Sequence, residues 1–318
     1  MDVKTAGPAG AMRSLRDHLG QGLVGHEALV ERLLVALLSG GHVLVEGPPG
    51  LAKTRAVKWL AQATEGSFAR IQCTPDLMPS DLTGTPVFRP QTGSFEFVKG
   101  PVFHNLVLVD EINRAPPKVQ SALLEAMAER QVTAGSDTWP LPSPFLVVAT
   151  QNPIEHDGTF PLPEAQLDRF LLHIVLSLPG AETERQILDL VEAEQHAPAK
   201  TVQAVPLAEL QEAQKTAMAV HLSPELRDYI VRLVMATREG PQAADVEHAV
   251  SPRGSLALAS AAKARAYLRG RDYALPEDVE ALAPDALAHR MVLTWRAVAE
   301  GRKPRDVVAA ILAEVEAL

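Results

Sequence analysis

The amino-acid sequence predicts an α/β protein in two parts: a mainly parallel sheet flanked by helices, followed by a domain made of helices. Three observations lead to this prediction. Apolar runs of strand length alternate with helix-like segments in the first part of the chain, which favours a parallel sheet. One of these runs leads into a Gly-rich loop and then a helix. From about Glu182 onward the strand-like runs stop, and only helical patterns follow.

The elements of the first part follow from their apolar patterns. An amphipathic helix is expected over residues 27–39, because its apolar residues recur at helical spacing and Gly40 and Gly41 stop it. Another helix is expected from about Pro116 to Arg130. Five strands are expected at residues 42–45, 68–73, 106–109, 145–150 and 170–176. Together these elements predict a five-stranded sheet with helical connections.

The domain organisation follows from the same patterns. We expect a flexible N-terminus at residues 1–10, an α/β domain at 11–180 and a helical domain at 181–318. The helical segments of the last part are residues 183–195, 207–216, 224–238, 253–268, 276–289 and 305–318. Two hairpin insertions are expected at about 85–98 and 132–139. Their aromatic residues Phe95, Phe97 and Trp139 either touch a substrate or neighbouring subunit, or pack locally, and local packing is favoured.

A loop rich in Gly and Pro follows the first strand and precedes a helix. Its eight residues are Gly47, Pro48, Pro49, Gly50, Leu51, Ala52, Lys53 and Thr54. In such a loop, backbone N–H groups cradle phosphate oxygens, the lysine reaches the β- and γ-phosphates, and the threonine hydroxyl holds Mg²⁺. The usual pattern has glycine at the position of Ala52. The loop predicts a nucleoside triphosphate site, and an ordinary tight strand-to-helix turn is the alternative.

Two carboxylates follow the third strand, because residues 106–109 run directly into Asp110 and Glu111. Ligands of open α/β sheets bind at the carboxyl ends of the strands, so both side chains are expected near the phosphate loop. Asp110 would bind Mg²⁺ directly or through water, and Glu111 would polarise the water that attacks the γ-phosphate. In isolation, the same pattern also fits a strand that runs into a solvated turn.

Two further polar residues complete the predicted site. Asn152 follows the fourth strand, where an amide can orient the attacking water, although Asn is also favoured in a turn before proline. Arg169 stands directly before the last strand, distant from its own nucleotide. A guanidinium at this edge can serve the site of a neighbouring subunit, or it can form a surface salt bridge with Asp168 or Glu164.

Two other arginines have less certain roles. Arg253 opens a helix of the second part, where it could reach the γ-phosphate and couple the angle of the helical domain to the nucleotide, or simply be a solvated helix start. Arg114 is either an interface residue or a partner for nearby carboxylates. The ten His residues have no metal-ligand spacing, and no Ser/His/Asp arrangement is evident, so neither a metalloenzyme nor a covalent hydrolase is supported.

The composition limits the class of protein. A chain of 318 residues with 47% hydrophobic content can form a sizeable core. No apolar stretch reaches the length of a membrane span, and no signal-peptide layout is present, so we expect a cytoplasmic location. The single Cys73 excludes an internal disulfide and fits a small buried strand residue. A net charge of −9 argues against broad binding to nucleic acid.

With these motifs in place, the chain resembles the MoxR family of AAA+ ATPases over nearly its whole length. The resemblance rests on residues 47–54, 74–84, 106–115, 149–153, 162–170 and 251–253, in the order and spacing of the family. It implies an AAA+ αβα sandwich with a mainly parallel five-stranded sheet, followed by an all-helical lid domain. Alanine before the loop lysine, as at Ala52, is usual in the family.

The resemblance also implies a role for each motif residue. By this resemblance the Walker A residues are Lys53 and Thr54, the Walker B residues are Asp110 and Glu111, sensor 1 is Asn152, the arginine finger is Arg169 and sensor 2 is Arg253. Val24 and Gly25 resemble the motif that contacts adenine, but His26 follows them where the family usually has Gln. The ligands implied are ATP and Mg²⁺.

Members of the family typically form hexameric rings and act as chaperone-like machines that remodel or mature client proteins, commonly with a von Willebrand factor A domain partner. This sequence contains no such domain, so a separate polypeptide is expected as that partner. One alternative is a DNA-acting AAA+ motor with a helix-two insert, which the net charge disfavours. The other is a non-hydrolysing nucleotide switch or adaptor, which the presence of Glu111, Asn152 and Arg169 disfavours.

Overall fold

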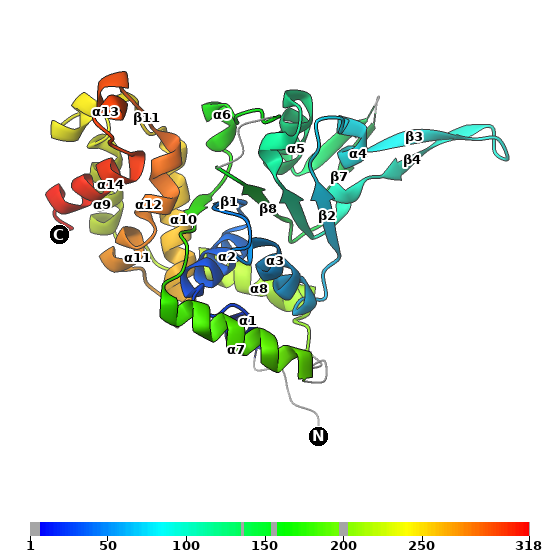
Figure 1. Cartoon of the computed structure of the whole chain (residues 1–318), viewed down its shortest axis with the longest axis horizontal. Coiled ribbons are helices and arrows are strands. Elements are labelled where there is room, and N and C mark those ends of the chain that lie inside the picture. The colour runs from blue at the N-terminus through cyan, green and yellow to red at the C-terminus, as the bar shows by residue number, and fades with distance from the viewer. Residues whose placement is uncertain (1–6, 135–136, 154–157, 197–202, 318) are drawn as a thin grey trace.

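The computed structural model describes the chain except for residues 1–6, 135–136, 154–157, 197–202 and 318. Its centre is a five-stranded sheet with the strand order β2-β5-β8-β1-β9 (Figure 1). Every neighbouring pair in this sheet is parallel. The strands are β1 (Val43–Glu46), β2 (Phe68–Gln72), β5 (Leu106–Asp110), β8 (Leu146–Gln151) and β9 (Leu172–Val175). The predicted fold class, an αβα sandwich with a mainly parallel sheet, is therefore confirmed.

The strands are apolar throughout because both faces of the sheet are covered. Val43 and Val45 belong to one hydrophobic core, and Leu44, between them in the chain, belongs to the core on the other face. The first core is covered by α1 (Gly7–Gly22), α2 (Glu27–Ser39) and α3 (Lys53–Gln62), and the second by α4 (Pro79–Thr83) and α5 (Pro117–Glu129). The short connecting elements are η1 (Pro101–Phe103), η2 (Ile112–Arg114) and α6 (Glu164–Leu167).

Helix α2 joins the sheet to the second part of the chain. It has the bounds that its apolar pattern predicts and ends at Gly40, whose φ of 63° lies in the left-handed region and lets its N–H cap the last turn. Its buried residues are Leu29, Val30, Leu33, Leu34, Val35, Ala36, Leu37 and Leu38. So many are buried because α2 packs on the sheet and also contacts α8 (Leu207–Met218) and α10 (Pro252–Leu268).

The second part of the chain is a helical lid domain, as predicted, but it also contains a small ribbon. β10 (Val246–His248) and β11 (Val292–Leu293) pair antiparallel, so the expectation of helices alone was incomplete. The other elements are α7 (Ala181–His196), α9 (Pro224–Met235), η3 (Pro241–Asp245), α11 (Pro276–Glu280), α12 (Ala283–Leu287), η4 (Ala288–Arg290), α13 (Trp295–Ala299) and α14 (Pro304–Glu314). In the described part of the chain, no helix is long and apolar enough to cross a membrane.

Two expectations about helices need correction. Residues 7–10, expected in a flexible terminus, form the start of α1, which buries Met12, Leu15 and Leu19. The segment 276–289, expected as one helix, is divided into α11, α12 and η4. The division falls beside Pro284 near the start of α12, where proline has no N–H to continue a preceding helix.

Two hairpins extend from the α/β domain. β3 (Gly84–Arg89) and β4 (Ser94–Lys99) pair antiparallel and project from the body, while β6 (Gln131–Ala134) and β7 (Asp137–Pro140) form a shorter pair (Figure 1). Phe97 stacks on Trp139 with ring centroids 5.2 Å apart, so these two aromatic residues pack between the hairpins. Phe95 lies 72% exposed and contacts Phe88 on the opposite strand.

Candidate nucleotide site

Three neighbouring strands bring the predicted site residues to one edge of the sheet. β1 leads into the phosphate loop, β5 ends at Asp110, and β8 ends one residue before Asn152. These strands are parallel and adjacent in the order β5-β8-β1. Their carboxyl ends therefore meet, and the loop, the two carboxylates and Asn152 lie together where open α/β sheets bind ligands.

The loop between β1 and α3 has the backbone of an anion site. Gly50 and Ala52 both adopt left-handed conformations, with φ of 85° and 52°. Ala52 therefore occupies a conformation that favours glycine, the residue usual at that position. A Cβ on Gly47 would lie 3.0 Å from both the Cβ and the backbone O of Leu176, so glycine allows the loop to pack against the end of β9. Helix α3 begins at Lys53, so its N-terminus and the loop N–H groups can hold phosphate together.

Lys53 and Thr54 extend from this helix start toward the neighbouring strands. The Lys53 Nζ donates to Gly47 O at 2.5 Å and to Gln151 O at 3.3 Å. The Thr54 Oγ1 donates to Asp110 Oδ1 at 3.4 Å. A hydroxyl and a carboxylate oxygen at this separation are the oxygen ligands that Mg²⁺ takes in proteins. The residues predicted to hold the metal therefore fit it chemically.

Asp110 is buried, and polar partners hold both of its carboxylate oxygens. Thr150 Oγ1 donates to Oδ1 at 3.2 Å, and Arg70 Nε donates to Oδ2 at 2.7 Å. Arg70 comes from β2, the neighbour of β5. No role for this arginine was predicted from the sequence. The only signal was that Arg70 and Gln72 alternate with the buried Ile71, which places both polar residues on one face of the strand.

Glu111 has a constrained backbone and a fixed carboxylate. Its φ of 57° is left-handed, and its N–H donates to Thr150 Oγ1 at 3.0 Å. Its Oε2 accepts from Gln72 Nε2 at 3.1 Å and from Arg114 Nη1 at 3.2 Å. Arg114 is thus a partner for a nearby carboxylate, one of its two predicted roles. Left-handed residues other than glycine cluster at functional sites, where neighbouring contacts maintain the unusual backbone.

Asn152 lies buried next to these residues, just past the end of β8. Its backbone O accepts a long hydrogen bond, 3.5 Å, from Asn113 Nδ2 in η2, the turn that follows Glu111. This contact joins η2 to the segment just past the end of β8. This contact of Asn113 was not predicted from the sequence.

The two arginines predicted to act on phosphate contact other groups in this structure. Arg169 is exposed, and its Nη1 donates to Leu124 O of α5 at 2.7 Å. Arg253 is 63% exposed in its side chain and lies 3.3 Å from Asp168 Oδ2. The predicted alternative for Arg169, a salt bridge with Asp168, is replaced by this pairing of Asp168 with Arg253. The chain therefore presents the Arg169 side chain at its surface.

The predicted adenine motif contacts the start of α7. Gly25 is exposed with a φ of 76°, and its N–H donates to Glu27 Oε1 at 3.3 Å. A Cβ on Gly25 would lie 2.1 Å from Thr183 Cγ2, so glycine allows this close approach to α7. His26, which replaces the usual Gln, is buried, and this burial lowers the pKa of its imidazole.

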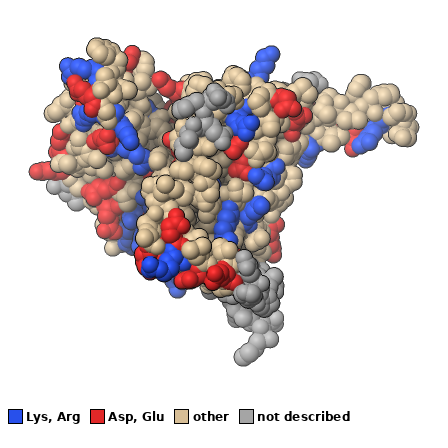
Figure 2. Space-filling view, viewed as in Figure 1, with Lys and Arg blue, Asp and Glu red and all other residues tan. Residues whose placement is uncertain are grey.

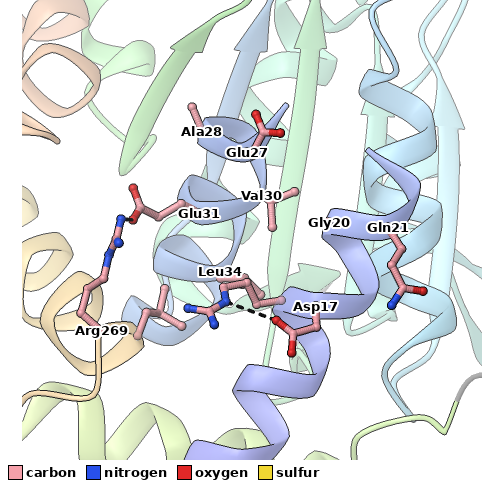
Figure 3. Close-up of a pocket in the computed structure, with 11 residues that line it drawn as sticks. Asp17, Gly20, Gln21, Glu27, Ala28, Val30, Glu31, Leu34 and Arg269 are labelled. Carbon is pink, nitrogen blue, oxygen red and sulfur yellow. Dashed lines mark hydrogen bonds and ion pairs between the residues drawn. The ribbon is translucent and has the colours of Figure 1, made fainter. Parts of the chain in front are cut away.

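A separate cavity of about 640 Å³ lies between α1, α2 and the end of α10 (Figure 3). Figure 3 shows the ion pair of Glu31 with Arg269 at its border. Asp17, which also lines the cavity, pairs with Arg16. Its described lining includes none of the predicted site residues. This cavity is therefore distinct from the nucleotide site.

A phosphate loop after β1, two acids after β5, a polar residue after β8 and a helical lid together define a P-loop ATPase of the AAA+ class. Comparisons with known proteins agree. Residues 42–172 match the family described as "ATPase family associated with various cellular activities (AAA)", and residues 238–311 match the AAA lid domain.

The chain is 49% identical to Chaperone MoxR1 of Mycobacterium tuberculosis (strain ATCC 25618 / H37Rv), over 92% of this chain and 78% of that protein. It is 44% identical to protein YeaC of Bacillus subtilis (strain 168), over 94% and 92%. The crystal structure of a putative ATPase from Cytophaga hutchinsonii matches with a TM-score of 0.89 and 43% identity, over 97% of this chain and 95% of that chain. The chain belongs to the MoxR family of AAA+ ATPases.

Proposed function

We propose that this chain hydrolyses ATP to ADP and phosphate as a subunit of a homo-oligomeric ring, hexameric by family resemblance, in which Arg169 of each subunit completes the site of its neighbour. The observation that carries the proposal is the position of Arg169, which is exposed and bonded to Leu124 O of α5. An arginine supplied in trans stabilises charge on the transferring phosphoryl group and can raise the rate by a factor on the order of 10³ to 10⁵.

Each residue of the site then has a defined part. The loop N–H groups and Lys53 bind the phosphates, while Thr54 and Asp110 hold Mg²⁺, which offsets phosphate charge when bound. Glu111 accepts a proton from the attacking water, and Asn152 orients that water. Val24 and Gly25 contact the adenine, and Arg253 contacts the γ-phosphate from the lid.

The contacts of the carboxylates support these separate roles. The 3.4 Å separation of Thr54 Oγ1 and Asp110 Oδ1 suits a pair of metal ligands. The contact of Arg70 with the other oxygen of Asp110 holds this carboxylate in one orientation. The hydrogen bonds from Gln72 and Arg114 to Glu111 hold its carboxylate separately from the two predicted metal ligands.

For the cellular role, we propose a chaperone-like machine that remodels or matures client proteins in the cytoplasm, together with a separate von Willebrand factor A domain partner. The relative named Chaperone MoxR1 supports the chaperone part of this role. A DNA-acting motor is less favoured. On the face in Figure 2, Lys and Arg are interspersed with Asp and Glu, and the net charge is −9. A non-hydrolysing switch would leave Glu111 and Asn152 without a role.

A mixture of two inactive variants tests the shared site. Arg169→Ala subunits keep their own Glu111 but donate no arginine, and Glu111→Gln subunits donate Arg169 but cannot activate water. Each variant alone is expected to be nearly inactive. If Arg169 acts in trans, an equal mixture regains turnover, since about a quarter of the interfaces in randomly mixed rings pair an intact Glu111 with an intact Arg169. A mixture as inactive as its components would refute the role in trans.

A further inference from the structure

The carboxylate of Asp168, directly before Arg169, is the meeting point of three lid side chains. Arg290 Nε donates to its Oδ1 at 2.9 Å. Ser251 Oγ and Arg253 Nη1 both donate to its Oδ2 at 3.3 Å. Asp168 therefore contacts Arg253, the predicted phosphate sensor of the lid, and directly precedes Arg169, the predicted arginine finger.

Arg290 also holds the backbone on the far side of Arg169. Its Nη2 donates to Phe170 O at 2.6 Å, and its Nη1 donates to Leu171 O at 3.2 Å. The side chain of Arg290 is 3% exposed. His289, the preceding residue in η4, is buried and contacts Phe170 O at 3.1 Å. These contacts tie the segment 168–171 to the lid, while Leu171 N, which donates to His42 O at 2.8 Å, ties the same segment to the sheet.

The two arginines hold Asp168 in different ways. The pair with Arg290 is buried and backed by carbonyl contacts, so it is a fixed connection. The pair with Arg253 lies at the surface, with 63% of the arginine side chain exposed. Ion pairs with an exposed partner are weak, and a phosphate group can form charge-assisted hydrogen bonds with the same guanidinium. Arg253 can therefore leave Asp168 for a phosphate while Arg290 stays in place.

We propose that Asp168 is a positioning residue that links the nucleotide bound by one subunit to the Arg169 which that subunit presents to its neighbour. When Arg253 exchanges Asp168 for phosphate, the lid changes position, and Arg290 transmits this change to Asp168 and to the backbone beside Arg169. The orientation of Arg169 then depends on the nucleotide state of its own subunit. This inference rests on the proposed role of Arg169 in trans.

The same mixture of variants separates this role from general structural damage. In the mixture, only Arg169→Ala subunits hydrolyse ATP, and only Glu111→Gln subunits donate the arginine. Asp168→Asn placed in the donors alone is expected to lower turnover about tenfold, because their Arg169 is no longer positioned. The same substitution in the hydrolysing subunits alone is expected to change turnover by less than about threefold.

Two further donor variants test the connection itself. Arg290→Gln should match the loss seen with Asp168→Asn, and Arg290→Lys, which keeps the charge, should restore part of the turnover. The matched control is Arg271→Gln. Arg271 is also a lid arginine paired with a carboxylate, Asp278 at 2.7 Å, but it lies outside the 168–171 contacts. This control should leave turnover near that of the parent mixture.

The outcomes are distinct. Equal losses in donors and hydrolysing subunits, or no loss in donors, would overturn the inference about Asp168. An inactive parent mixture would instead refute the role of Arg169 in trans. ATP affinity and ring size of each donor, measured alone, confirm that a substituted donor still folds and assembles. If Asp168→Asn does not assemble, Arg290→Lys is compared with Arg290→Gln. Higher turnover with lysine than with glutamine supports the inference, and equal turnover overturns it.

Discussion

The free energy of unfolding should fall steeply below neutral pH. The buried imidazole of His42 is one physical source of this dependence. His42 is buried just before β1, the strand that carries the phosphate loop. Its Nδ1 accepts from Val147 N at 3.0 Å, and its Nε2 lies 3.2 Å from Met127 O. The neutral ring satisfies both contacts, with Nε2 donating. Burial therefore lowers the pKa of His42 from 6.5 to about 4.

The sign and size of the effect follow from this lowered pKa. Between about pH 6.5 and 4 the unfolded chain binds a proton at this histidine and the folded chain does not. The stability that neutral His42 contributes is thus complete above pH 6.5 and is lost as the pH falls toward 4. A difference of about 2.5 pKa units corresponds to about 3 kcal/mol in all, of which about 2 kcal/mol is lost between about pH 7 and pH 5.

Urea unfolding of the wild type and of His42→Gln, each at about pH 7 and pH 5, measures this contribution. Glutamine keeps an N–H donor and does not titrate, and the carboxylates contribute equally to both proteins. The wild type should lose about 2 kcal/mol more than the variant on acidification. Equal losses in the two proteins would refute the reasoning. His289, whose pKa burial also lowers well below its ordinary value, acts in the same direction in both proteins.

Three further predictions concern the site and its surroundings. Glu111→Gln should keep ATP binding but lower kcat on the order of 10²-fold or more, since the water loses its base; undiminished phosphate release would contradict this role. Thr54→Ala should raise the Mg²⁺ concentration that gives half-maximal turnover, on the order of tenfold, because one oxygen ligand is removed; an unchanged Mg²⁺ titration would exclude Thr54 as a ligand. Cys73 is buried, and burial raises the pKa of its thiol to about 12. Iodoacetamide should therefore label it slowly in the folded protein and readily in urea, and similar rates in both would show that the thiol is accessible.

The parts of the fold that could be predicted are those coded locally. β1, β5 and β8 are continuous apolar runs because both of their faces are buried. Polar residues follow each of these runs directly. The sequence alone was therefore enough to predict that the loop, Asp110 and Asn152 lie at one edge of the sheet. The start of α1 was missed because Gly7, Pro8 and Gly10 are typical of an irregular terminus, whereas tertiary burial of one helix face stabilises it.

The parts of the site that were missed depend on contacts distant in sequence. Arg70 and Gln72 reach the carboxylates only because β2 pairs with β5 in a register that aligns Gln72 with Asp110. Arg290 is separated by 122 residues from Asp168, so no spacing in the chain indicates that they meet. Such contacts follow from the packing of whole elements, which hydrophobic patterns specify only coarsely.

The central claim is that the site is shared between subunits, and ATP turnover per subunit against protein concentration tests it most directly. The molecular size should be determined in parallel, with and without ATP. The account predicts that turnover rises steeply over the concentrations at which rings form, and that Arg169→Ala removes this rise while leaving ATP binding largely intact. Rapid turnover by a monomer, independent of protein concentration, would contradict it.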